Sequence, residues 1–223
     1  MDTWHLWNDA VRDPALNMAL DEALLRTAGE RGRPLLRVYR WSAPAVSIGF
    51  FQRFSPELAP GRPVVRRPTG GGLVDHARDA TYTVVAPPGH ALYRMPTAES
   101  YRVIHEAVVV ALQRIGVAAR LAPCCAPERS GVCFAAPVKF DVVAGGHKVA
   151  GAAQRRLKRG LLHQGSILLP ATATLNGELR VGFEKALGAA FESYEPPPGL
   201  LALAEKLRAE KYATTAWTER FRA

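Results

Sequence analysis

Three consecutive glycines, Gly70, Gly71 and Gly72, are the first feature of this sequence that could serve chemistry. They lie in the segment RRPTGGGLVDH (66–76). Because glycine has no Cβ, the backbone of such a loop can approach a ligand closely. The segment is not a Walker phosphate loop, since no Gly-Lys-Ser/Thr closes it, and it lacks the G-x-G-x-x-G spacing of a dinucleotide site. A tight structural turn between two strands is the alternative interpretation.

Cys133 carries a thiol that could act as a nucleophile, and Lys148 carries an ammonium group that could stabilise negative charge. A cysteine thiol has an ordinary pKa of about 8.5, so only about a few per cent is thiolate at neutral pH. An ammonium group nearby favours the thiolate, and it can also stabilise the oxyanion formed when a carbonyl carbon is attacked. Taken alone, Cys133 could equally be a small buried hydrophobic residue and Lys148 a surface lysine.

The segment VKFDVVAGGHKVAGAAQR (138–155) predicts a β-hairpin with a Gly-Gly pair at the centre of its turn. Val143 then lies opposite Lys148. Asp141 lies opposite Ala150 in the same register. Asp141 and Lys148 are therefore expected as diagonal neighbours on one face of the hairpin. Asp141 either positions the lysine or forms a plain salt bridge with it.

Short β-type runs and longer helical patterns surround these residues. The predicted strands are 35–41, 45–50, 63–67, 80–86, 138–143, 148–155 and 161–169, and the predicted helices are 13–28, 97–115, 178–187 and 200–211. Short strands at close spacing favour an α+β fold, with a central, mostly antiparallel (mixed) sheet flanked by helices. No linker or repeat divides the chain, so we expect a single domain over 1–223 with its core at about 31–212.

The composition is that of a soluble globular protein, with 48% hydrophobic and 22% charged residues. The net charge of +9 favours an acidic partner. The arginines are scattered, which argues against nucleic-acid binding, and no window has the roughly 18 apolar residues of a membrane helix. There are three cysteines, of which Cys124 and Cys125 are adjacent, and this pattern predicts neither a disulfide framework nor a metal site. We therefore expect a cytoplasmic protein.

Three motifs in a fixed order resemble one known family: RRPTGGGLVDH, KFDVVAGGHKVAGAAQRR and HQGSILL. With the opening PALNMALDEALL, they are similar to the lipoate-protein ligases, octanoyltransferases and biotin-protein ligases. The resemblance runs from about Trp4 to Trp217. It implies a catalytic domain whose sheet is related to that of biotin synthetases and class II aminoacyl-tRNA synthetases.

Within that family, the segment VCFAAP around Cys133 resembles the cysteine-dependent bacterial octanoyltransferases. The ligases typically carry an Asn-Asp pair in this region. The resemblance implies that Cys133 accepts octanoate from octanoyl-acyl carrier protein as a thioester, with Lys148 as its catalytic partner and without a cofactor. The acyl group would then pass to a lysine of a lipoyl domain, in 2-oxoacid dehydrogenases or the glycine cleavage H protein, during lipoate biosynthesis.

The resemblance also implies a set of residues that line a slot for the acyl chain and the pantetheine arm. These are Arg67, Gly70, Gly71, Gly72, Leu73, Val74, His76, Asp141, Gly151 and His163. Asp141 could position either Lys148 or the incoming lysine. Gly72 stands where the transferases often have Arg and the ligases have Gly. His163 precedes Gln164, whereas the transferase strand usually reads Gln-His, so which of these two side chains faces the site stays open.

Three other functions are compatible with these residues. An ATP-dependent lipoate-protein ligase would need ATP and Mg. An octanoyl amidotransferase would move the acyl group between carrier proteins and would also need the cysteine. A non-catalytic module of the same fold would bind an acyl carrier and turn over nothing.

Overall fold

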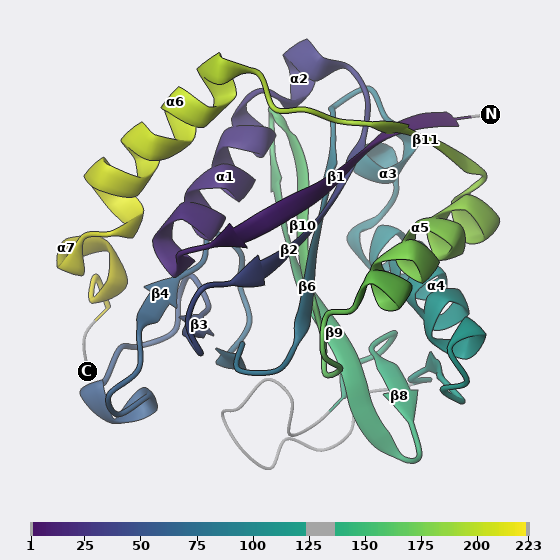
Figure 1. The fold of residues 1–223 in the computed structure, drawn as a ribbon, viewed down its shortest axis with the longest axis horizontal. Coiled ribbons are helices and arrows are strands. Elements are labelled where there is room, and N and C mark those ends of the chain that lie inside the picture. Colours follow the sequence, from purple (N-terminus) through teal and green to yellow (C-terminus); the bar gives the residue numbers. More distant parts are fainter. Residues whose placement is uncertain (1, 124–136, 222–223) are drawn as a thin grey trace.

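A computed structural model describes residues 2–123 and 137–221, in which eight strands form one large sheet (Figure 1). In spatial order these are β11 (Ala189–Ser193), β1 (Asp2–Arg12), β2 (Leu35–Trp41), β6 (Ala80–Ala86), β10 (Gly160–Ile167), β9 (His147–Leu157), β8 (Val142–Ala144) and β7 (Arg120–Leu121). Strand β1 runs parallel to β11 and β2, and every other neighbouring pair is antiparallel. The predicted α+β fold with a mixed, mostly antiparallel sheet is confirmed.

A second, three-stranded sheet carries the glycine loop. Its strands are β4 (Val64–Arg66), β3 (Val46–Ile48) and β5 (Val74–Asp75), in that spatial order. Strand β3 is parallel to β4 and antiparallel to β5, so the three glycines form the connection between the two outer strands. The loop is therefore a strand-to-strand connection, as its sequence predicts.

Two pairs of helices cover opposite faces of the large sheet (Figure 1). Helices α4 (Thr97–Arg114) and α5 (Ala173–Leu187) cover one face, and α1 (Pro14–Arg26) and α6 (Pro198–Leu207) cover the other. Alternate residues of a strand point to opposite faces, and the two cores follow that rule. On β6, Tyr82 and Val84 pack with the first pair and Val85 packs with the second. A Cβ on Gly182 of α5 would lie 2.2 Å from the Ala107 carbonyl oxygen, so this glycine lets α4 and α5 pack closely.

The remaining helical segments are short. They are α2 (Ala28–Arg31), a 3₁₀ turn (Pro56–Leu58), α3 (Ala91–Arg94), a π-helical turn (Arg208–Tyr212) and α7 (Thr215–Thr218). Within the described ranges, none of the helices has the length and apolar character needed to cross a membrane.

Helix α1 begins where its sequence predicts. The Asp13 side chain accepts hydrogen bonds from the backbone N–H groups of Ala15 and Leu16, and Pro14 occupies the first turn, where no N–H is required. Strand β1, by contrast, was not predicted. Only Trp4 and Trp7 of its eleven residues are buried, so backbone pairing on both sides holds it in the sheet more than an apolar pattern does.

The β8–β9 hairpin agrees with its predicted register in part. Val143 lies opposite Lys148, as expected. The predicted pairing of Asp141 with Ala150 is wrong, because the register shifts after Val143 and Val142 takes that place. Strand β8 begins at Val142, so Asp141 lies in the turn before the strand. A bulge of this kind re-aims side chains locally.

Candidate functional site

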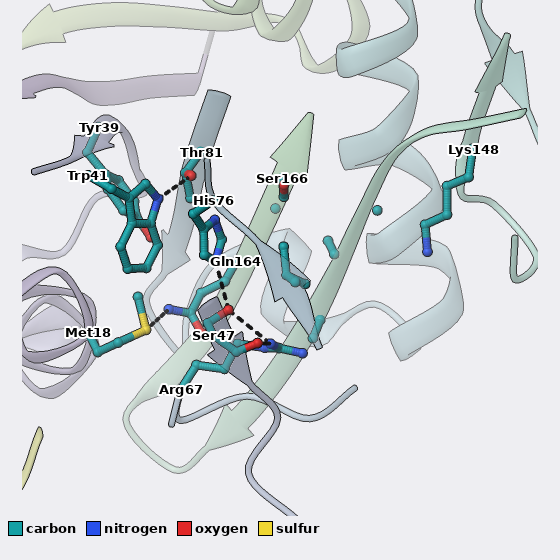
Figure 2. A pocket seen from close by; sticks show the side chains of 15 residues that line it. Met18, Tyr39, Trp41, Ser47, Arg67, His76, Thr81, Lys148, Gln164 and Ser166 are labelled. Carbon is teal, nitrogen blue, oxygen red and sulfur yellow. Dashed lines mark hydrogen bonds between the residues drawn. The ribbon is translucent and has the colours of Figure 1, made fainter. Parts of the chain in front are cut away.

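A cavity lies where the small sheet meets strands β2, β6, β9 and β10 (Figure 2). The space between its walls is about 450 Å³, part of which is open to solvent. One part of the lining is apolar or aromatic and the other part is polar. The lining residues are Met18, Tyr39, Trp41, Ser47, Arg67, Val74, His76, Thr81, Lys148, Gly151, Ala152, Ala153, Gln164, Gly165 and Ser166.

Arg67 shapes the glycine loop beside this cavity. Its Nη2 donates to the carbonyl oxygens of Gly70 and Gly72 at 2.7 Å each, and its Nε donates to Gly70 at 3.2 Å. Its Nη1 donates to both the carbonyl oxygen and the Oγ of Ser47 at 3.1 Å. One buried guanidinium thus ties the loop to strand β3, through the several donors that arginine holds in a fixed plane.

Gly49 allows the glycine loop to come this close. A Cβ at position 49 would lie only 1.8 Å from the carbonyl oxygen of Gly71, so any side chain there would collide with loop backbone. Gly71 itself has a φ of 85°, in the left-handed region that side chains disfavour. The loop therefore depends on glycine for two separate reasons.

His76 lies between a serine and a carboxylate. Its Nε2 is 2.8 Å from Ser47 Oγ, and its Nδ1 is 2.8 Å from Asp79 Oδ2. The ring stacks on Trp41 with centroids 3.9 Å apart. Asp79 thus places a carboxylate beside the ring.

Lys148 and Asp141 form a buried ion pair. Lys148 Nζ is 2.8 Å from Asp141 Oδ2, and the two side chains are 6% and 0% exposed. The Tyr101 hydroxyl donates to Asp141 Oδ1 at 2.5 Å, and the Val138 N–H donates to Oδ2 at 2.8 Å. Lys148 is thus not a surface lysine, and its ammonium group has a defined position at the wall of the cavity (Figure 2).

Gly151 makes room for that ammonium group. A Cβ at this position would lie 2.4 Å from Cε and 2.7 Å from Nζ of Lys148. The small residue in the hairpin therefore allows the lysine to lie across the β9 backbone.

Strand β10 presents Gln164 to the cavity and His163 to the opposite face. His163 is buried beside α4, where its Nε2 lies 3.2 Å from the Tyr82 hydroxyl and its Nδ1 lies 3.0 Å from Gln154 Nε2. Burial lowers the pKa of His163 well below its ordinary value, so the ring is neutral. Of the two side chains that the sequence left open, it is Gln164 that lines the cavity.

A buried charge network fixes Gln164. Its Nε2 donates to Asp21 Oδ2 at 2.6 Å, and its Oε1 accepts from Thr69 Oγ1 at 2.7 Å. Asp21 is paired in turn with Arg37 at 2.7 Å, and both side chains are fully buried. Helix α1 therefore supports the floor of the cavity through polar contacts.

The predicted site residues differ in where they lie relative to the cavity. Arg67, Val74, His76, Lys148 and Gly151 line the cavity. Gly70, Gly71, Gly72 and Leu73 form the adjoining loop, and Asp141 holds Lys148. His163 lies on the opposite face of the sheet. Cys133 lies outside the described residues, as do Cys124 and Cys125, so the relation of Cys133 to Lys148 stays a prediction.

Several residues at this site were missed by the sequence reasoning. They are Trp41, Ser47, Asp79 and Tyr101. The sequence did hold a signal for Ser47, because this polar residue stands between the apolar Val46 and Ile48 and so faces away from their cluster. Among residues 2–123 and 137–221, no group of three or more His, Cys, Asp or Glu side chains is gathered as a metal site requires.

A mixed sheet between two helix pairs, with a glycine loop and a buried hairpin lysine at one cavity, defines a catalytic domain of the lipoate-protein ligase type. Residues 13–181 match the family model of the lipoyl protein ligase A/B catalytic domain, and the chain belongs to that family.

The curated relatives compared below are octanoyltransferases. The octanoyltransferase LipM of Kyrpidia tusciae is 40% identical over 184 residues, which cover 76% of this chain and 67% of the relative. The LipM of Anoxybacillus flavithermus is 32% identical over 97% of this chain and 98% of its own length. The LipM of Staphylococcus aureus is 38% identical, and the match spans 66% of its length. Among solved structures, a putative lipoate protein ligase from T. acidophilum with bound lipoic acid has a TM-score of 0.82 at 25% identity, covering 99% of both chains.

Proposed function

We propose that this chain is an octanoyltransferase of lipoate biosynthesis, which moves an octanoyl group onto a lysine of a lipoyl domain. The relatives named octanoyltransferase support the proposal. The observation that carries it is the buried Lys148 ammonium at the wall of a cavity with an apolar part. A fixed positive charge stabilises a thiolate or a developing oxyanion, and the apolar lining suits an acyl chain.

Different parts of the cavity wall have different roles in the proposed transfer. Met18, Trp41 and Val74 would contact the octanoyl chain. The ammonium of Lys148 would face the thioester carbonyl. Asp141 and Gly151 would act on the reaction only through Lys148, because one anchors the lysine and the other leaves space for it.

Cys133 is the proposed nucleophile. Its thiolate attacks the carbonyl carbon of the donor thioester, a new C–S bond forms, and the donor leaves as a thiolate that takes up a proton. The neutral amine of the acceptor lysine then attacks this enzyme thioester. A C–N bond forms, Cys133 leaves as a thiolate, and the amine gives up its proton. No nucleotide is consumed, since the acyl group arrives already activated.

The proposed donor is octanoyl-acyl carrier protein, in the cytoplasm. The proposed acceptors are the lipoyl domains of 2-oxoacid dehydrogenases or the glycine cleavage H protein. The net charge of +9 supports partners with acidic surfaces, because opposite charges speed association and fix its orientation.

A second candidate is an ATP-dependent lipoate-protein ligase. Its support is the similarity of fold to a putative lipoate protein ligase with bound lipoic acid. Gly72, which ligases share, adds to that support. This function predicts an acyl-adenylate and tolerance of a Cys133→Ala change.

Intact-mass spectrometry tests the proposal. The protein is mixed with octanoyl-acyl carrier protein without ATP, beside Cys133→Ala and the control variant Cys124→Ala. We expect an octanoyl thioester, which neutral hydroxylamine cleaves, on the wild type and on Cys124→Ala only, and its transfer to a lipoyl domain added afterwards. If there is no adduct, and an adenylate forms once ATP and free acid are supplied, the protein is a ligase. Octanoylated lipoyl domain supplied as the donor distinguishes an amidotransferase.

A further inference from the structure

Ser47, His76 and Asp79 form a hydrogen-bonded line that the proposed transfer leaves unused. Ser47 Oγ is 2.8 Å from His76 Nε2, and His76 Nδ1 is 2.8 Å from Asp79 Oδ2. The three residues are 2%, 7% and 7% exposed. Ser47 and His76 both line the cavity (Figure 2). A serine, an imidazole and a buried carboxylate in this order are the groups of a nucleophilic triad, which is recognised by geometry and not by sequence position.

The neighbours of this line determine where its protons lie. Arg67 Nη1 donates to Ser47 Oγ at 3.1 Å, and a guanidinium can only donate. A serine oxygen can accept more than one hydrogen bond, so the tautomer follows from Asp79 instead. A carboxylate only accepts, and His76 Nδ1 therefore donates to it. In the neutral ring Nε2 is then the acceptor, and the Ser47 hydroxyl hydrogen points to it. This is the tautomer in which a histidine acts as a general base toward a serine.

The carboxylate and the ring are both held in place. Asp79 Oδ2 also accepts from Ser166 Oγ at 2.6 Å and from Thr81 Oγ1 at 3.0 Å. Trp41 Nε1 donates to Thr81 Oγ1 at 2.8 Å, while the Trp41 ring stacks on His76. The imidazole is thus fixed from one edge and one face before any substrate binds, which is the preorganisation that a base requires.

We infer that Ser47 is a second nucleophile of this cavity, activated by His76 and oriented through Asp79, which takes the acyl group of medium-chain esters or thioesters. An apolar acyl group is inferred because Met18 and Trp41 line the same cavity as the serine. This activity goes beyond the proposed transfer and does not depend on Cys133.

The reaction balances with the groups present. Ser47 Oγ attacks the carbonyl carbon while its proton passes to His76 Nε2. The bond from the carbonyl carbon to the leaving sulfur or oxygen breaks, and the leaving group takes that proton from His76. Water then attacks the serine ester by the same route, and the products are a carboxylic acid and a thiol or alcohol.

Labelling with an octyl fluorophosphonate tests the inference, since an activated serine displaces fluoride from this probe. The full chain and its Cys133→Ala variant are treated, and the tryptic peptide of residues 41–53 is sequenced by mass spectrometry. We expect the adduct on Ser47 in both proteins. Exposed Ser42 in the same peptide is the internal control. Asp79→Asn should slow the labelling by roughly 10²- to 10⁴-fold because it favours the wrong tautomer, and Ser42→Ala should leave the rate unchanged.

Two results would overturn the inference. One is a folded wild type, verified by circular dichroism, that carries no adduct on Ser47. The other is equal labelling of the wild type and of folded Asp79→Asn. Failure of the proposed transferase function is separable, because it appears as a missing Cys133 thioester while Ser47 labelling persists.

Discussion

Lys148 Nζ and Asp141 Oδ2 lie 2.8 Å apart inside the protein, although the hairpin that joins them departs from simple register. The shift leaves Asp141 in the turn before β8. There the carboxylate meets donors from three segments: Val138 in the turn, Tyr101 on α4 and Lys148 on β9. The lysine therefore takes its position from tertiary contacts as well as from the turn.

Lys148→Met should cost both activity and stability. The variant leaves the Asp141 charge buried with two donors, so we expect the free energy of unfolding to fall by about 3 kcal/mol. Octanoyl transfer should fall by roughly 10²- to 10³-fold, since a preorganised positive charge is lost. Urea unfolding and a transfer assay measure the two effects. Lys158→Met, on the exposed β9–β10 turn, is the control.

The double variant Lys148→Met/Asp141→Asn extends this test. Removing the second charge as well should restore part of the lost stability, because no uncompensated charge is then buried. Activity should stay at the level of the single variant. A double variant less stable than Lys148→Met would contradict the ion-pair account.

Gly151→Ala should displace the lysine while sparing the fold. The added Cβ collides with the far end of a flexible side chain, which can move at little cost. We therefore expect transfer to fall at least tenfold, with a smaller loss of stability than in Lys148→Met, because both charges of the buried pair are kept. Gly177→Ala on α5, where a Cβ meets nothing within 4 Å, is the matched control. Full activity in Gly151→Ala would show that the position of Lys148 is not critical.

Gly49→Ala, unlike Gly151→Ala, should cost much stability as well as activity. Here the added Cβ meets loop backbone at 1.8 Å, and backbone cannot turn aside as a side chain can. Overpacking of this kind costs about 3 kcal/mol, so we expect clear destabilisation along with lost activity. Thermal unfolding of Gly49→Ala beside Gly89→Ala, whose Cβ meets nothing within 4 Å, measures it. Equal melting temperatures would refute the close approach of the loop.

Mild acid should destabilise the protein through a buried histidine. Burial lowers the pKa of His105 to about 4, whereas an unfolded histidine takes up a proton near pH 6.5. Between these values the unfolded state binds more protons, so the free energy of unfolding falls as the pH drops through that window. From pH 7 to pH 5 this group alone accounts for a loss of about 2 kcal/mol.

His105→Gln checks the pH prediction. The variant should lose about 2 kcal/mol less between pH 7 and pH 5 than the wild type does. His147→Gln, at the exposed start of β9, is the control and should behave like the wild type. Denaturant unfolding at both pH values gives the comparison. An unchanged pH dependence in His105→Gln would contradict the assignment.

Local sequence determined much of this fold. Strands β2 and β6 occupy the residues that their apolar runs predict, and α1 begins at its Asp cap. The Gly-Gly turn also formed where it was expected, since Gly145 and Gly146 both have positive φ. These features depend on backbone preferences and side-chain spacing within a few residues, which a sequence displays directly. The order of the motifs likewise sufficed to identify the family.

Tertiary structure decided the rest. Strand β1 depends on partners distant in the chain, and Gln164 faces the cavity where His163 does not. The Ser47–His76–Asp79 line joins two segments about thirty residues apart. None of these relationships leaves a periodic pattern in the nearby sequence. Each is set by which strands pair and by which side chains share a face of the sheet. The chain therefore determined its elements and its family by itself, and only their packing decided which side chains share the cavity.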